Sequence, residues 1–245
     1  MHAPPRSPAL LVLLLGTACT TVESPINTTL PDDRLRRVVV DVDQGDLSYA
    51  PGTPGALQFE GREWGRASDP EDATARLDAV EFMAHRDGDV AIARGLSTGW
   101  GAGTDVDVHG PAGIDVTLET RSGTARLSGV SGMQVIRADH VEVWDSQGSF
   151  DIAATGTVDA RLRPGRGDHI RIMAEGDVVL ALPPGLDYDM QIWGDPEHTL
   201  EVHDLGFEAA YGGDGYFGGV AGPGTTRVDV MVTGGSIQVL PEWHW

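Results

Sequence analysis

Three side chains that could bind a metal ion alternate along one short segment. Asp105, Asp107 and His109 are separated by Val106 and Val108, and alternate residues of a β-strand point to the same side. Two carboxylates and an imidazole on one face could bind Ca²⁺ or a transition metal. The same alternation arises on any strand with one solvated face, and no second cluster with ligand spacing accompanies it. We therefore expect a polar strand surface here and assign no metal ligand.

Two further histidines, His198 and His203, are flanked by Glu197 and Asp204. A separation of five residues places two side chains on opposite faces of a strand, so this pair cannot chelate one ion unless the strand is broken. The other histidines show no His-Glu-x-x-His spacing. The sequence predicts surface histidines and no metal site.

Groups suited to nucleophilic or phosphate chemistry are scarce. The chain has no lysine, since all 17 of its basic residues are arginine, and this excludes a Walker-type phosphate loop and Schiff-base chemistry. The glycine-rich run over 212–215 lacks the strand–turn–helix context of a phosphate loop. The sole cysteine is Cys19, and we expect no nucleophile elbow. We predict no catalytic and no cofactor-binding residue.

The tryptophans are the residues best suited to contact a glycan or a protein, because exposed aromatic rings stack on sugars and anchor interfaces. Trp144 and Trp193 each follow an inward-pointing residue, which predicts an outward or corner position. Large aromatic residues also cover the open ends of repeat domains, and Trp243 and Trp245 suit such a cap. We favour packing over binding for the set. The six are Trp64, Trp100, Trp144, Trp193, Trp243 and Trp245.

The formal net charge of −20 limits the possible partners. An acidic chain lacks the basic surface that neutralises phosphates, so we expect no nucleic-acid partner. The simplest consequence of the charge is a soluble, solvated surface.

The first 19 residues combine Arg6, a seven-residue apolar run over 9–15, and Gly-Thr-Ala before Cys19. This order is typical of a secretory signal, and the run is too short to span a bilayer. The end of the segment resembles the lipobox of bacterial lipoproteins, which implies a signal peptide over 1–18 and lipidation of Cys19. The resemblance also implies the outer membrane, because Thr20 and not aspartate follows the cysteine. Ordinary cleavage nearby is the alternative. The polar residues over 19–36 are predicted to form a flexible tether.

Strand-like alternation dominates the chain from Arg37 onward. Val38, Val40 and Val42 alternate with other residues, and the same period of two recurs along the chain. Many such runs follow a glycine and an Asp, Ser or Thr, as at Gly123 and Gly148. Glycine allows a positive φ at a corner, and a repeated corner-plus-strand unit indicates stacked repeats.

The predicted fold is therefore all-β, a single repeat domain of the β-solenoid or parallel β-helix type with glycine corners. A β-sandwich is the alternative, since periodicity does not distinguish the two. One short helix is predicted over 70–77, capped by Ser68 or Asp69. A hairpin is predicted over 80–93 and a glycine-rich loop over 206–224.

Four segments resemble the bacterial putative-adhesin family. They are VDVDQGDLSYAPG (40–52), DVDVHGPAGIDVTLETRSGTARLSGVSG (105–132), GDVVLALPPGLDYDMQIWG (176–194) and TRVDVMVTGGSIQVLPEW (226–243). The resemblance spans about 37–241 and implies a β-solenoid domain with no catalytic residues to transfer. The sequence departs from the family pattern at Asp139–His140, where a glycine corner is expected, and in the insertion over 206–224.

These observations lead to a functional hypothesis. We expect a non-enzymatic lipoprotein of the cell envelope that presents an adhesion, scaffold or interaction surface, needs no cofactor, and is attached to the membrane through Cys19. A protein or a glycan is the expected surface partner. The alternatives are an enzyme acting on surface polysaccharide, which would need converging acidic groups in a groove, and a regulatory envelope module.

Overall fold

The computed structural model describes residues 19–203, 205–207 and 209–242. It confirms the all-β prediction, because strands and one short helix make up its regular structure. Alternation explains how the strands form: in β2 (Arg37–Val42), Val38, Val40 and Val42 are fully buried and the residues between them are not. Each strand thus gives one row of side chains to the core and one row to solvent.

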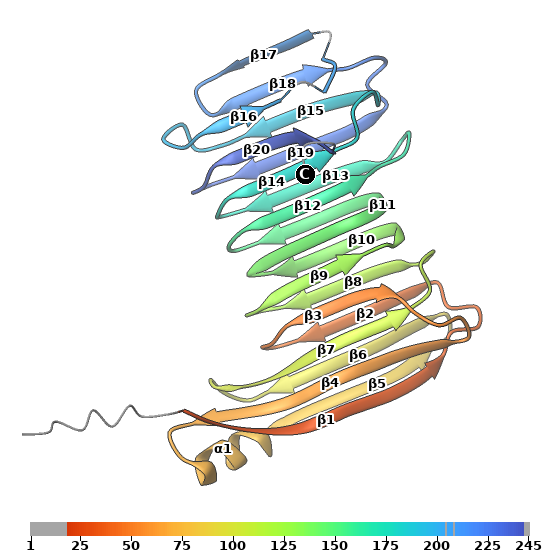
Figure 1. Ribbon diagram of the computed structural model, residues 1–245, viewed down its shortest axis with the longest axis vertical. Coiled ribbons are helices and arrows are strands. Elements are labelled where there is room, and N and C mark those ends of the chain that lie inside the picture. The colour runs from red at the N-terminus through yellow and green to blue at the C-terminus, as the bar shows by residue number, and fades with distance from the viewer. Residues whose placement is uncertain (1–18, 204, 208, 243–245) are drawn as a thin grey trace, which may run out of the picture.

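The strands stack along the long axis of the molecule in two faces that enclose one core (Figure 1). Within each face, neighbouring strands pair in parallel. In spatial order, face I contains β6 (Val90–Ser97), β2, β8 (Asp115–Thr120), β10 (Ser131–Ala138), the second part of β11 (His140–Ala154), β13 (His169–Ala174), β19 (Thr226–Val232) and β15 (Tyr188–Trp193). Face II contains β7 (Ala102–Gly110), β3 (Leu47–Pro51), β9 (Thr124–Ser128), the first part of β11, β12 (Val158–Arg163), β14 (Val178–Leu182), β20 (Ile237–Pro241) and β16 (Leu200–Val202).

The chain passes repeatedly from a face I strand through a corner to a face II strand, as from β8 to β9. The order in space differs from the order in sequence at two places. Strand β2 pairs with both β6 and β8, and β19 pairs with both β13 and β15. Strands β2 and β3 are therefore inserted between β6–β7 and β8–β9. Strands β19 and β20 are likewise inserted between β13–β14 and β15–β16. Both insertions bring distant parts of the sequence together.

The glycine corners are confirmed at both positions singled out from the sequence. Gly123 has φ 144° and Gly148 has φ 101°, backbone conformations that favour glycine. A Cβ at Gly123 would lie 2.1 Å from the carbonyl oxygen of Gly45, and one at Gly148 would lie 2.2 Å from that of Gly132. At the departure from the family pattern, the Asp139 amide donates to the Gly123 carbonyl at 3.1 Å. The corner continues there without glycine.

The core is mainly aliphatic and contains two buried tyrosines. Tyr49 and Tyr188 are fully buried, and their hydroxyls donate to the carbonyls of Pro111 at 2.8 Å and Pro183 at 2.7 Å. Burial raises the pKa of both tyrosines far above the usual value. Each phenol is therefore a neutral hydrogen-bond donor that satisfies a turn carbonyl.

One end of the stack is closed by β1 (Thr20–Pro31), β4 (Ala56–Ala67) and β5 (Val80–Asp87), and by α1 (Pro70–Leu77). Strand β1 pairs antiparallel with β4 along its whole length. The prediction of a flexible tether is therefore wrong for residues 20–31. This segment is polar because it forms a strand at the end of the sheet, which has no partner on its outer edge. Ile26 is its one buried residue.

The helix and the hairpin predicted near this end are confirmed. Helix α1 begins after Asp69, whose side chain accepts a hydrogen bond from the Asp72 amide at 2.9 Å. The β5–β6 hairpin turns at Gly88, which has φ 61°. No helix in the described part of the chain is long and apolar enough to span a bilayer.

The other end is closed by a hairpin of β17 (Ala209–Gly213) and β18 (Tyr216–Val220). The prediction of a loop over 206–224 is wrong for these strands. Glycine-rich sequence forms a hairpin here because large rings pack directly on its backbone: a Cβ at Gly218 would lie 2.7 Å from the ring of Tyr211, and one at Gly219 would lie 2.9 Å from those of Phe207 and Phe217.

Candidate functional site

The three candidate ligands of β7 lie where the alternation predicts, on the outer side of face II. The side chains of Asp105 and Asp107 already have protein partners. Asp105 accepts hydrogen bonds from Arg62 Nε at 2.9 Å, from Trp64 Nε1 at 3.1 Å and from the Asp46 amide at 3.1 Å. Asp107 accepts from Ser48. In the described residues there is no group of three or more side chains that could hold a metal ion.

Two arginines on this side of the molecule each lie between carboxylates of neighbouring segments. Arg62 forms ion pairs with Glu23 at 2.8 Å and with Asp105 at 2.9 Å. Arg126 lies between Asp46 at 3.3 Å and Glu142 at 3.1 Å. The hydrogen bond with Asp105 raises the pKa of Arg62 above its ordinary value. These carboxylates therefore neutralise arginines on the adjacent strands.

The two histidines near the last strands lie at the surface, and they do not share a strand. His198 is in the turn before β16, with its Nδ1 3.5 Å from Asp195. His203 follows β16, with its Nε2 3.8 Å from Glu201. The expected placement on opposite faces of one strand is wrong, because the strand begins only at Leu200. Asp204 lies outside the described residues.

The chain carries one Gly-x-Ser-x-Gly pattern, over residues 95–99, so the prediction of no nucleophile elbow depends on the surroundings of Ser97. Ser97 is the last residue of β6, and a loop to β7 follows it where an elbow requires a helix. Its hydroxyl is buried without a hydrogen-bond partner among the described residues. The serine therefore lacks both the turn and the adjacent base that would activate it.

The described tryptophans comprise two half-buried and two exposed residues. Trp64 and Trp144 are half-buried. Trp193 is 40% exposed at the end of β15, which confirms its predicted outward position, and Trp100 is 87% exposed. Trp243 and Trp245, the predicted end cap, lie outside the described residues.

Exposed apolar residues line up across face I. Parallel register places Ala153 opposite Met173, Met173 opposite Met231, and Met231 opposite Trp193. Met173 is 40% and Met231 44% exposed. The antiparallel hairpin extends the row, since Tyr216 lies opposite Trp193. Tyr211 is two residues from the position opposite Tyr216, and its ring contacts that of Tyr216. We call these residues the apolar strip: Ala153, Met173, Met231, Trp193, Tyr216 and Tyr211.

The aromatic end of the strip is held in a defined arrangement. The ring centroids of Trp193 and Tyr216 are 5.8 Å apart, as are those of Tyr211 and Tyr216. The Tyr216 hydroxyl donates to Gln191 Oε1 at 2.5 Å. Contacts of this kind keep the rings in place in the absence of a ligand.

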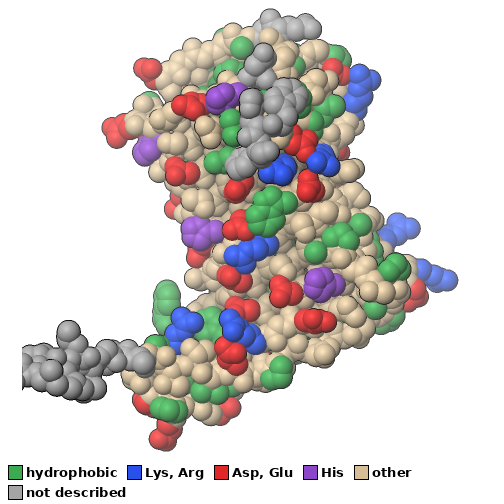
Figure 2. Space-filling model, in the orientation of Figure 1, with side chains coloured by type: hydrophobic (Ala, Val, Ile, Leu, Met, Phe, Trp, Pro, Cys, Tyr) green, Lys and Arg blue, Asp and Glu red, His purple; other side chains and the backbone are tan. Residues whose placement is uncertain are grey.

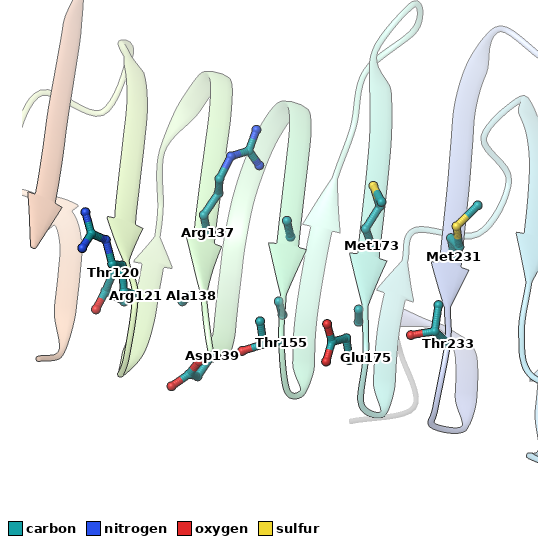
Figure 3. Close-up of a pocket in the computed structure, with 13 residues that line it drawn as sticks. Thr120, Arg121, Arg137, Ala138, Asp139, Thr155, Met173, Glu175, Met231 and Thr233 are labelled. Carbon is teal, nitrogen blue, oxygen red and sulfur yellow. Dashed lines mark hydrogen bonds between the residues drawn. The ribbon is translucent and has the colours of Figure 1, made fainter. Parts of the chain in front are cut away.

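A groove of about 500 Å³ runs beside the methionine end of the strip. Its walls include Ala153, Met173 and Met231, and polar residues lie at its corner side (Figure 3). A smaller hollow of about 170 Å³ lies between the methionines and Trp193. The groove forms where small alanine side chains lie beside long methionine side chains on a regular sheet.

The polar groups beside the strip are paired with one another. Asp229 accepts from Arg227 Nε at 2.8 Å and from His169 Nε2 at 2.9 Å. Although burial opposes it, these two partners lower the pKa of Asp229. Arg137 lies 3.2 Å from Asp151. The strip therefore offers apolar contact area beside Asp229 and Arg137, whose charges are neutralised, and such a surface suits binding.

The sequence contains one signal for the apolar strip, namely large apolar residues at outward positions of strands. Met173, Met231 and Trp193 each follow an inward-pointing residue, so all three occupy outward positions that are polar elsewhere. Only the register of β13, β19 and β15 brings them together. That register depends on the insertion of β19, which periodicity does not reveal.

No family model matches the chain, and no curated protein matches it in sequence. Among solved structures, a putative cell adhesion protein from Clostridium sporogenes is similar, with a TM-score of 0.52 and 8% identity over 90% of this chain and 100% of that chain. A putative adhesin from Bacteroides fragilis covers 89% of this chain and 97% of that chain, with a TM-score of 0.24 and 8% identity. The first likeness is one of fold: the chain shares its all-β architecture with a bacterial adhesin-like protein.

Proposed function

We propose that this protein is a non-enzymatic protein of the cell envelope that binds a partner through the apolar strip. One observation carries the proposal: Met173, Met231 and Trp193 are exposed in register on adjacent strands. Large contiguous apolar surface is unusual on soluble proteins and typically marks an interaction site. Methionine and aromatic residues are also the types enriched where proteins bind one another.

We infer that the scaffold is a β-solenoid. Parallel pairing between successive strands of each face supports this inference, since a sandwich of the immunoglobulin type is built from antiparallel neighbours. A solenoid is a stiff support for a row of side chains, because each strand holds its residue at a fixed distance of about 4.8 Å from the next. The likeness to a putative cell adhesion protein is consistent with this use.

Membrane attachment through a lipid on Cys19 is part of the proposal. The predicted signal peptide over 1–18 lies outside the described residues. Cys19 itself is exposed and directly precedes β1, which leaves it accessible to modification. Two or more acyl chains give the stable attachment that one chain does not. By its resemblance to the lipobox pattern, the chain is expected in the outer membrane.

Site-specific cross-linking on intact cells tests the strip. A photoreactive residue replaces Met231 on face I, and a matched control replaces Glu201, which is exposed on face II of the same end of the stack. We expect a defined cross-linked product from position 231 and none from position 201. Equal labelling at both positions, or none at either, would overturn the proposed use of the strip.

A further inference from the structure

The exposed cysteine lies at the same edge as the most exposed tryptophan. Cys19 Sγ donates to the carbonyl of Ala67 on β4 at 3.3 Å, and the amide of Arg66 donates to the carbonyl of Gly101 at 2.7 Å. Strands β1, β4 and β7 are neighbours, so Cys19 and the loop before β7 are separated by two strand spacings, about 10 Å.

Trp100 belongs to that loop and is 87% exposed, more than any other large hydrophobic side chain in the described part of the chain. Its ring has no aromatic partner among the described residues. An indole in this state is unfavourable in water, and tryptophan is enriched where one side of a protein meets a membrane interface. Trp64, half-buried on β4, lies nearby on the same edge.

Two arginines at this edge are not neutralised by carboxylates. Arg66 lies over the ring of Trp64, with 5.5 Å between its Cζ and the ring centroid, and its Nε is 3.4 Å from Thr21 Oγ1. Arg76 on α1 donates to the carbonyls of Arg66 at 2.7 Å and Trp100 at 3.2 Å. Neither forms an ion pair with an acidic side chain of the described residues. Arg62, two residues before Trp64, is paired with both Glu23 and Asp105.

We propose that Trp64, Arg66, Arg76 and Trp100 form a second, non-covalent contact with the membrane, made to anionic phospholipid headgroups. We call these four residues the anchor edge. Figure 2 shows basic and hydrophobic side chains gathered beside the point where the described chain begins. The charges of Arg66 and Arg76 complement lipid phosphates, although Asp72 lines the same hollow as Arg76 and Trp100. The molecule as a whole, with its net charge of −20, is repelled by an anionic surface. Trp100 enters the headgroup layer, and the two guanidinium groups pair with phosphates.

The inference rests on the proposed attachment at Cys19, because a single basic edge does not hold an acidic protein on an anionic surface. A lipid anchor and a basic patch together are the usual pair of signals. Docking of the anchor edge also fixes which end of the stack faces the membrane. Trp193 of the apolar strip then lies seven strand spacings or about 35 Å from the level of β6 and β7, and the aromatic end of the strip is free to meet a partner.

Quenching of tryptophan fluorescence by brominated phospholipids tests the contact. The protein is purified from its host, its N-terminus is identified by mass spectrometry, and it is placed in vesicles of phosphatidylethanolamine and phosphatidylglycerol. If the Cys19 thiol proves to be free, or if cleavage removes Cys19, a chain that begins at Cys19 is coupled through this thiol to a maleimide-bearing phospholipid, which is specific because the chain has one cysteine. Docking is then measured whether or not cells acylate Cys19, so the two proposals fail separately.

We expect brominated lipid to quench the wild-type emission, Trp100→Phe to remove most of that quenching, and Trp193→Phe to leave it unchanged. Paired Arg66→Gln and Arg76→Gln substitutions should weaken docking by about fivefold per arginine. The matched control, Arg94→Gln with Arg171→Gln, removes the same charge from exposed sites on face I and should not weaken it. Thermal melting of each variant verifies the fold. Quenching that persists in Trp100→Phe, or that the control pair reduces equally, would overturn the inference.

Discussion

Most charged residues on the two faces form ion pairs of opposite sign, but one pair of neighbouring residues consists of two carboxylates. Asp159 on β12 lies opposite Glu142 on β11. Burial, together with the negative charge of Glu142, raises the pKa of Asp159. The fold therefore favours the protonated acid, and stability is lost as the pH rises from the unfolded-state pKa through the folded-state pKa. At neutral pH the ionised pair opposes folding.

Replacing Asp159 with asparagine should raise the melting temperature at pH 7, because the amide removes the repulsion and the cost of burying a charge. At pH 3, where the acid is protonated in both states, the substitution should have little effect. Asp41→Asn on β2 of face I, where the register neighbours are Arg94 and Glu119, serves as the control. Thermal melts at the two pH values decide, and a lower melting temperature at pH 7 would contradict the argument.

Cys19 is the one residue whose role depends on a chemical modification. The exposed thiol directly precedes β1, so the first described strand begins after the residue that the lipobox resemblance marks. We expect the mature protein to begin at an acylated Cys19, and Cys19→Ser to leave the protein unprocessed or released from the membrane. Mass spectrometry of the N-terminal peptide measures this. A mature N-terminus elsewhere, with an unmodified thiol or none, refutes it.

The glycine corners allow neighbouring strands to pair at the normal distance between β-strands. Valine at Gly123 or Gly148 would combine an unfavourable φ with a Cβ about 2 Å from a carbonyl oxygen of the adjacent corner. We expect each variant to lose on the order of 1–3 kcal/mol of unfolding free energy. Gly99→Val is the matched control, since no atom lies within 4 Å of its Cβ position. Chemical denaturation compares the three, and corner variants as stable as Gly99→Val would remove the structural role of the corners.

Elements with local signals could be predicted from the sequence, and elements defined by distant partners could not. The cap at Asp69 and the turn at Gly88 specify α1 and the β5–β6 hairpin within a few residues. Strand β1 carries no such signal, because its polar residues fit an end strand as well as a tether. The β17–β18 hairpin was missed for a related reason: its glycines are typical of loops, and the rings that pack on them are outside the local pattern.

The candidate site required the order of the strands. Val38, Val40 and Val42 would fit beside almost any parallel strand of the stack, so periodicity does not show that β2 lies between β6 and β8. The same holds for β19. Individual outward positions such as Trp193 were predictable, whereas the apolar strip exists only because β19 brings Met231 between Met173 and Trp193.

At the scale of the whole molecule, the two ends of the stack have different chemistry. The end with β1, β4 and α1 carries the anchor edge, and the end with β15, β18 and β17 carries the aromatic part of the apolar strip (Figure 1). A parallel stack cannot bend sharply between them, because the strands between the two ends are hydrogen-bonded on both sides. A surface protein gains from this separation, since a partner at the far end does not compete with the membrane.

The strongest case for an enzyme is the pair of Asp159 and Glu142, because a raised pKa suits a general acid and a second carboxylate could serve as nucleophile. Glycoside cleavage also needs a cleft that holds the sugar around the pair, and these side chains project from an open strand surface. Neither lines the groove or the hollow beside the apolar strip. We therefore expect no new reducing ends and no unsaturated products when the protein is incubated with the surface polysaccharides and peptidoglycan of its host. Turnover that Asp159→Asn abolishes, in a variant that still melts at or above the wild-type temperature, would show that the molecule is an enzyme and would refute the proposed binding function.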